Sequence, residues 1–99
     1  MDVLDLLDMT EEEQTVECEK YGRQFTESLA DLAFRMRDEV CDGFGLRYNW
    51  NIALKEVWNK SCTQHQKACY ISANGWWIEK SKPIHWIVAA IKAKELAGK

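Results

Sequence analysis

The stretch ACYISANGWWIEK, residues 68–80, places Asn74-Gly75 between two runs of residues that favour β-strands. Asn-Gly is a preferred pair for the two-residue type I′ turn of a hairpin, because both turn positions need positive φ. The loop length fixes the register and pairs Ser72 with Trp77. The sequence therefore predicts a β-hairpin with one face in the core and with Tyr70 and Trp77 as exposed aromatics on the other face.

Before this hairpin, the pattern is helical. Thr10-Glu11-Glu12-Glu13 has the form of a capping box, so a helix is predicted to begin at Thr10. Apolar residues then recur every three or four positions as far as about Cys41, which predicts one long helix that Gly22 can kink or break. This apolar stripe consists of Cys18, Tyr21, Phe25, Leu29, Leu32, Met36 and Val40.

Two further helices are predicted. One follows the flexible stretch 42–45, with Asn49 as its N-cap and an end near Ser61 or Cys62. Its apolar face contains Trp50, Ala53, Leu54, Val57 and Trp58. The other has Pro83 in its first turn, where the missing N–H is not needed. Its buried stripe contains Ile84, Ile87, Val88, Ile91 and Leu96, and Trp86, Ala90 and Ala93 widen this face enough for packing on two sides.

These elements define an α+β fold in the order α-α-β-β-α, with a long N-terminal helix and the hairpin packed between helices. An isolated hairpin is marginal in water, so an extra short strand is expected near residues 44–48, or from a second subunit. The chain of 99 residues is 46% hydrophobic and 29% charged, which predicts a single folded domain over residues 1–99. Residues 1–9 are a candidate for a mobile or separately docked segment.

Compartment signals point to the cytoplasm. The N-terminus lacks the positive flank and continuous apolar run of a secretory signal peptide. No stretch approaches the ~20 apolar residues that span a bilayer, so no membrane association is expected. The four cysteines form no C-x-x-C pair and are predicted to be reduced thiols.

Charge is divided unevenly along the chain. Residues 1–45 carry 13 acids and 4 bases (−9), whereas residues 46–99 carry 3 acids and 9 bases (+6), for a net charge of −3. All five Trp lie in the basic half. A net acidic chain lacks the phosphate attraction that dominates DNA affinity, so direct DNA binding is not expected. The acidic segment between Asp2 and Glu19 has three interpretations. It neutralises the protein's own basic half, it binds a basic partner, or it mimics nucleic acid.

The basic half holds the candidate ligand site. Lys80-Ser81-Lys82 directly precedes the predicted third helix, so two ammonium groups, a hydroxyl and the positive helix end could converge on a phosphate. Aromatic side chains on the adjacent strand could stack a nucleobase. The alternative is that these are solvated lysines beside packing aromatics. The candidate ligand-binding residues are Arg47, Tyr48, Tyr70, Trp77, Lys80, Ser81, Lys82 and His85. For His85, a surface or helix-capping role is the first interpretation and ligand contact is the second.

Metal binding and catalysis have weaker signals. Cys62-x-x-His65-x-x-x-Cys69 has close spacing, and Cys41 could be a fourth ligand of a structural zinc site. We interpret these residues as buried cysteines and an exposed loop histidine instead, because Cys69 lies on the predicted core face. The chain has no G-x-S-x-G elbow and no P-loop, so we expect neither an enzyme nor a metal or other cofactor.

The linear pattern also resembles a known family. Leu29-Ala30-Asp31-Leu32-Ala33 through Val40, the helix from Trp50 to Trp58, the aromatic strands and the Pro-led helix from Pro83 to Leu96 are similar to the phage ABA-sandwich family of small bacteriophage proteins. The resemblance covers roughly residues 22–97, and the acidic first 20 residues depart from it. It implies a small α/β sandwich made in an infected bacterium, without catalytic residues to carry over, and an anti-defence or host-takeover role.

We therefore expect a non-catalytic, phage-type binding protein, cytoplasmic in the infected host and homo-oligomeric, that counters host defence by sequestering a small anionic, nucleotide-like signal. The alternative is a protein–protein inhibitor that occludes a host immune protein or nuclease, because Trp, Tyr and Arg are enriched at binding hot spots. Replacement of Lys80 and Lys82 by alanine should abolish sequestration of the ligand, whereas deletion of residues 1–9 should affect mainly the inhibition of a host protein.

Overall fold

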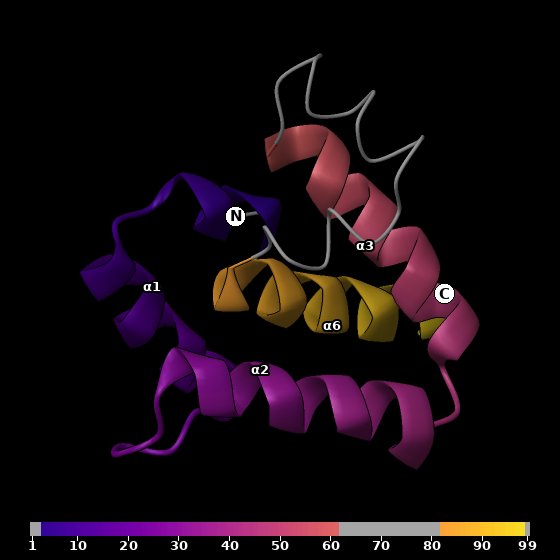
Figure 1. The fold of residues 1–99 in the computed structure, drawn as a ribbon, viewed down its shortest axis with the longest axis horizontal. Helices are drawn as coiled ribbons and strands as arrows, with labels where there is room; N and C mark the ends of the chain where they lie inside the picture. Colours follow the sequence, from indigo (N-terminus) through magenta and orange to yellow (C-terminus); the bar gives the residue numbers. More distant parts are fainter. Residues whose placement is uncertain (1–2, 62–81, 99) are drawn as a thin grey trace.

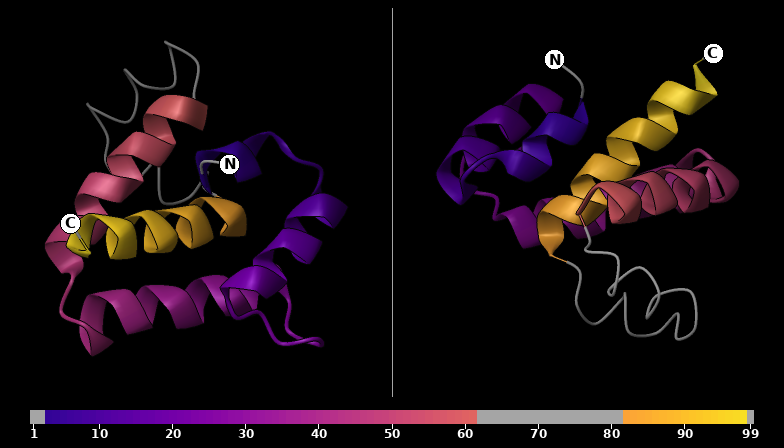
Figure 2. Two further views of the ribbon diagram at one scale, coloured as in Figure 1. Left: turned by 180° about the vertical axis from the view of Figure 1, so that it is seen from behind. Right: turned by 90° about the horizontal axis from the view of Figure 1, so that it is seen from above.

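The last helix, α6 (Pro83–Ala97), lies at the centre of the fold, between α2 (Leu29–Asp38) and α3 (Arg47–Ser61) (Figure 1). The computed structural model describes residues 3–61 and 82–98. The view from above shows α6 crossing both neighbouring helices rather than running in one plane with them (Figure 2).

Helix α6 is central because it is apolar on nearly every side, and such a helix is stable only when neighbours cover it on several faces. Its predicted start at Pro83 is confirmed, as is packing on two sides. Leu96 is the exception within the predicted stripe, because it is only half-buried. The buried residues of α6 are Ile84, Ile87, Val88, Ala89, Ala90, Ile91 and Ala93.

The chain begins with a 3₁₀ helix, η1 (Val3–Asp8), which packs on α6 and buries Val3 and Leu6 in the core. Helix α1 (Glu11–Cys18) follows, and its predicted capping box at Thr10 is confirmed. The Thr10 Oγ1 accepts a hydrogen bond from the Glu13 N–H at 3.2 Å, and the Glu13 carboxylate accepts from the Thr10 N–H at 3.1 Å. The buried Gln14 amide donates to the Leu6 carbonyl at 2.8 Å and so joins α1 to η1.

The helix predicted to run to about Cys41 is not continuous, and the alternative of a break at Gly22 is confirmed. Helix α1 passes into a short 3₁₀ turn, η2 (Glu19–Tyr21), and ends at Gly22, whose φ of 97° is left-handed. Glycine adopts this conformation without the steric cost that a side chain brings. A new helix, α2, then starts after Ser28, whose hydroxyl accepts from the Asp31 N–H at 3.1 Å.

The predicted strand near residues 44–48 is also wrong, because α3 begins at Arg47. A π-helical segment, η3 (Glu39–Gly43), ends α2 and turns the chain, with the Leu46 N–H donating to the Val40 carbonyl at 2.8 Å. Asn49 lies inside α3 rather than capping it, whereas the predicted end at Ser61 is confirmed. Trp50, Ala53, Val57 and Trp58 are buried as predicted, and Leu54 is half-buried.

These findings correct the fold class. About 81% of the described residues are helical and none of them is in a strand, so the described part of the fold is all-α rather than α+β in the order α-α-β-β-α. Helices η1, α2 and α3 cover the apolar surface of α6. The predicted hairpin around Asn74-Gly75 lies outside the described residues. Among the helices that are described, none has the length and apolar character to cross a membrane.

Candidate functional site

Helices α2, α3 and α6 meet at a group of three aromatic side chains and one arginine, which we call the aromatic–arginine cluster: Phe34, Arg37, Trp50 and Trp86. The Phe34 and Trp86 rings meet edge to face with their centroids 5.3 Å apart. The Trp50 and Trp86 rings do the same at 6.2 Å. Edge-to-face contacts of this kind are favourable because the positive ring edge meets the negative ring face.

The cluster runs from the core to the surface. Trp50, in the first turns of α3, is only 5% exposed, and Trp86, in the first turn of α6, is half-buried. Phe34 is 59% exposed at the outer end. Phe34 and Arg37 are three residues apart on α2, so both side chains project from the same side of that helix. The cluster therefore presents a ring and a guanidinium together at the surface.

The Arg37 guanidinium lies against the two indoles, with its Cζ 5.4 Å from the Trp86 ring centroid and 6.0 Å from that of Trp50. Such cation–π contacts hold the planar group while leaving its N–H edge available. In the described parts of the chain no group accepts a hydrogen bond from the Arg37 side chain, and the nearest carboxylate, of Asp38, is 3.8 Å away. The N–H edge of Arg37 therefore has no acceptor at hydrogen-bond distance within the described segments.

Other arginines of the chain are already engaged. Arg35 donates to both carboxylate oxygens of Glu27 and to the Gly22 carbonyl. Arg23 pairs with Glu19 at 3.2 Å. The contrast identifies Arg37 as the arginine that is held in place without a carboxylate within hydrogen-bond distance.

Two residues of the predicted ligand site lie at the start of α6. Lys82 is exposed directly before the helix, one turn from Trp86. The His85 Nδ1 accepts a hydrogen bond from the Lys82 N–H at 2.9 Å, so the predicted capping role of His85 is confirmed. Burial, and then the charge of Lys82, lower the pKa of His85 from 6.5 to about 4. His85 is therefore neutral near pH 7 and adds no positive charge to the site.

The other predicted ligand residues are placed elsewhere or lie outside the described ranges. Arg47 begins α3 and donates to Asp42 at 2.7 Å. Tyr48, the next residue, is 76% exposed. The remaining four predictions, Tyr70, Trp77, Lys80 and Ser81, lie between the two described segments of the chain and stay predictions.

Sequence reasoning missed Phe34 and Arg37 as site residues and assigned Trp50 and Trp86 to the core. The signal that was available is the spacing Phe34-x-x-Arg37 on an amphipathic helix, because an aromatic and a cation three residues apart share a face. Trp50 and Trp86 are 36 positions apart in the sequence, and no spacing pattern shows that their rings meet. Their convergence is a property of the tertiary packing.

Cysteine and metal chemistry receive no support from the described residues. Cys18 and Cys41 are buried free thiols. Burial raises the pKa of Cys18 to about 11 and also raises that of Cys41, so both are protonated near neutral pH and unreactive. The residues of the metal alternative, Cys62, His65 and Cys69, lie outside the described segments; within those segments no three potential ligands form a metal-binding group.

The charge division along the sequence is partly compensated in three dimensions. Three bases of the second half pair with acids of the first half: Lys60 with Asp8 at 3.2 Å, Lys94 with Glu39 at 2.8 Å, and Arg47 with Asp42 at 2.7 Å. Glu11 and Glu12 form no ion pair in the described part of the protein. Within the described segments, bases of the second half therefore neutralise some of the acidic residues of the first half but none of those in α1.

The described part of the chain is a small helical fold with an arginine held by aromatic rings near its surface. No protein-family model, curated protein or solved structure matches this chain.

Proposed function

We propose that this protein is a non-catalytic binding protein that sequesters a small anionic, nucleotide-like ligand, with Arg37 as the main anion contact. The observation that supports the proposal is the position of the Arg37 guanidinium, held by the Trp50 and Trp86 rings with no hydrogen-bond acceptor among the described residues. A guanidinium is always charged and matches the geometry of phosphate oxygens.

The neighbouring groups fit a nucleotide better than a bare anion. The Phe34 ring is exposed beside Arg37 and offers a surface on which a base can stack. Lys82 is exposed one turn before Trp86 and supplies a second cation at the positive end of α6. A nucleotide combines a planar ring with a phosphate, so it can use both kinds of group at once.

The biological setting of the proposal comes from the resemblance to the phage ABA-sandwich family. That resemblance favours a nucleotide signal of bacterial defence as the ligand and an infected bacterium as the place of action. It also favours a role that depends on removing the ligand from solution rather than converting it, in keeping with the expectation of a non-enzyme.

The test is a titration of the purified protein with cyclic and linear nucleotides, followed by tryptophan fluorescence and melting temperature. Arg37→Gln should weaken binding about ten-fold or more, since a charge-assisted hydrogen bond contributes about 1.5–3 kcal/mol. Asp38→Asn should tighten it, because the carboxylate 3.8 Å from Arg37 opposes an anion. Lys55→Gln, at an exposed lysine of α3, is the control and should leave affinity unchanged.

A failure of every nucleotide to shift either signal at millimolar concentration would contradict the proposal. Equal affinity of the wild-type and Arg37→Gln proteins would do so as well. If binding is lost instead in a Lys80→Ala, Lys82→Ala double variant while Arg37→Gln binds normally, the site centres on the sequence-predicted lysines and not on the aromatic–arginine cluster.

A second candidate function is the inhibition of a host protein by occlusion, and the observation that favours it is the 87% exposure of Phe25. Deletion of residues 1–9, the test that the sequence suggests, would remove the fully buried Leu6 and nearly buried Val3 from the core. Loss of activity would then report loss of folding. Substitutions of exposed side chains are the appropriate test of this function.

A further inference from the structure

Phe25 is the most exposed of the large hydrophobic residues in the described segments, at 87%. It lies in the loop between Gly22 and α2, and Val16, on the neighbouring helix α1, is 61% exposed. Both elements lie at the same end of the molecule, away from the start of α3 (Figure 1). Neither side chain belongs to the hydrophobic core, so their position is not explained by packing within the described part of the chain.

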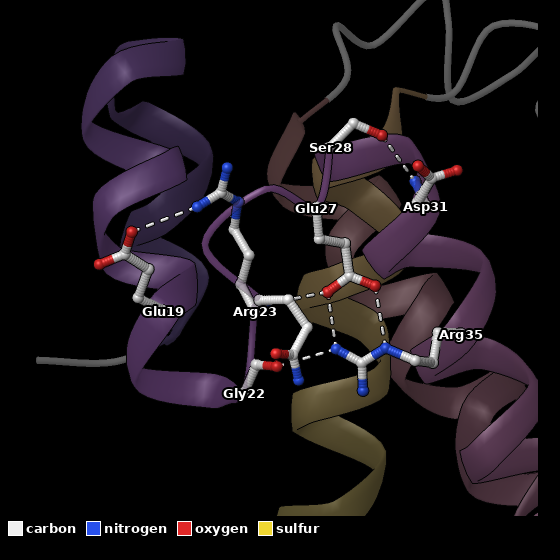
Figure 3. A network of polar contacts seen from close by, with 8 residues as sticks. Glu19, Gly22, Arg23, Glu27, Ser28, Asp31 and Arg35 are labelled. Atoms are coloured by element: carbon white, nitrogen blue, oxygen red, sulfur yellow. Dashed lines mark hydrogen bonds and ion pairs between the residues drawn. The ribbon is translucent and has the colours of Figure 1, made fainter.

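The loop that carries Phe25 is fastened to α2 by a single arginine (Figure 3). Arg35 donates from Nε and Nη2 to the two carboxylate oxygens of Glu27, at 2.9 and 2.8 Å. The same Nη2 donates to the Gly22 carbonyl at 2.8 Å, and the Gln24 N–H donates to Glu27 at 3.1 Å. The residues on both sides of Phe25 are therefore tied to one guanidinium.

The other end of the loop is fastened to α1. Arg23 is only 11% exposed and pairs with Glu19 at 3.2 Å, as Figure 3 shows. The Arg23 N–H donates to the Cys18 carbonyl at 3.2 Å, and the Glu27 N–H donates to the Gln24 carbonyl at 3.0 Å. A loop held in this way loses little conformational freedom when it binds, which favours affinity. The contacts thus hold the backbone on both sides of the exposed Phe25.

The surroundings of Phe25 and Val16 are acidic. Residues 11–31 contain seven acids and two bases, a net charge of −5. Lys20 and Arg23 are engaged with Glu17 and Glu19, and Glu27 is engaged with Arg35. The exposed residues Glu11, Glu12 and Asp31 make no ion pair among the described residues, which leaves unbalanced negative charge on the helices that flank the loop of Phe25.

We propose that Phe25 and Val16, with Glu11 and Glu12 of α1, form a docking surface for a protein partner that presents the apolar face of an amphipathic helix bordered by lysine and arginine. We call this set the Phe25 surface. Phe25 packs against this apolar face, and the carboxylates of Glu11 and Glu12 select its basic border by charge complementarity. The inference deepens the second candidate function, occlusion of a protein, and is independent of the anion site at Arg37.

The test uses the full chain and a defined probe, a synthetic amphipathic helical peptide of leucine and lysine, with binding measured by calorimetry. Phe25→Ser should weaken binding about ten-fold or more, and Glu12→Gln should weaken it less and reduce its salt dependence. Tyr48→Ser, at a comparably exposed aromatic on α3, is the matched control and should bind as the wild type does. Phe25 is exposed, so its variant should fold normally, as circular dichroism would verify.

Equal binding of the wild-type and Phe25→Ser proteins, or equal binding of unstructured polylysine, would overturn the Phe25 surface. Binding of a leucine and glutamate peptide as tight as that of the lysine peptide would overturn the basic partner while leaving the occlusion function in place. The Phe25→Ser protein should bind nucleotides with the same affinity as the wild type. The anion site at Arg37 is therefore tested independently of the Phe25 surface.

Discussion

At the first turn of α6, His85 accepts a hydrogen bond from the Lys82 N–H and is held neutral by burial. The capping role could be read from the sequence, because Lys82-Pro83 marks a helix start and the residue three positions on can reach back. The displaced pKa could not, since it depends on what packs over the imidazole. The same limit applies to Arg37, whose free guanidinium edge is defined by Trp50 and Trp86 from other helices.

The lowered pKa of His85 should make the stability of the protein depend on pH. The folded pKa of His85 is about 4 and the reference value is 6.5, so between these values the unfolded chain binds a proton that the folded chain does not. The free energy of unfolding therefore falls as the pH is lowered from 6.5 towards 4. His85→Gln keeps an acceptor for the Lys82 N–H and removes the titration, so its stability should change less over this window. Urea unfolding at several pH values measures the difference, and identical pH slopes would contradict a buried neutral His85.

At the scale of elements, periodicity in the sequence located the helices better than it located their ends. Leu32, Met36 and Val40 are buried as the apolar stripe predicts, whereas Phe25, on the same stripe, is exposed. The stripe continues through Gly22, but the helix does not, because the tie from Arg35 to Glu27 and the Gly22 carbonyl stabilises a loop there. These contacts join residues 8 and 13 positions apart, which is beyond the spacing that a helical pattern encodes.

Gly22 is therefore the residue that ends the first helical segment. Gly22→Ala should destabilise the protein by about 1 kcal/mol, because alanine is strained at a φ of 97° even though no atom lies within 4 Å of the added Cβ. Gly43→Ala is the matched control, since its Cβ would meet only the Glu39 Cγ at 3.9 Å and its φ is not left-handed. That variant should be neutral or slightly stabilising in thermal unfolding. A Gly22→Ala protein as stable as the wild type would show that the break has another cause.

At the scale of the whole molecule, the division into an acidic and a basic half is bridged by ion pairs and by a shared core. Lys60 pairs with Asp8 and Lys94 pairs with Glu39, so the two halves of the sequence are joined at the surface as well as through α6. The sequence predicted that α6 would be covered on two sides but did not indicate which elements cover it. The identity of the covering elements depends on which apolar faces meet, and no local pattern contains that information.

The prediction of one domain over residues 1–99 can be tested through Leu6, which is fully buried near α6 although it lies in the first turn of the chain. Leu6→Ala should cost about 2–5 kcal/mol, because it removes buried methyl groups and leaves a cavity. If η1 belongs to the same cooperative unit as α3 and α6, denaturant unfolding followed by tryptophan fluorescence and by circular dichroism should shift together in this variant. Asp5→Ala, at an exposed position of the same 3₁₀ helix, should shift neither transition. An early, separate transition confined to circular dichroism would instead show that residues 1–9 dock independently of the helices around α6.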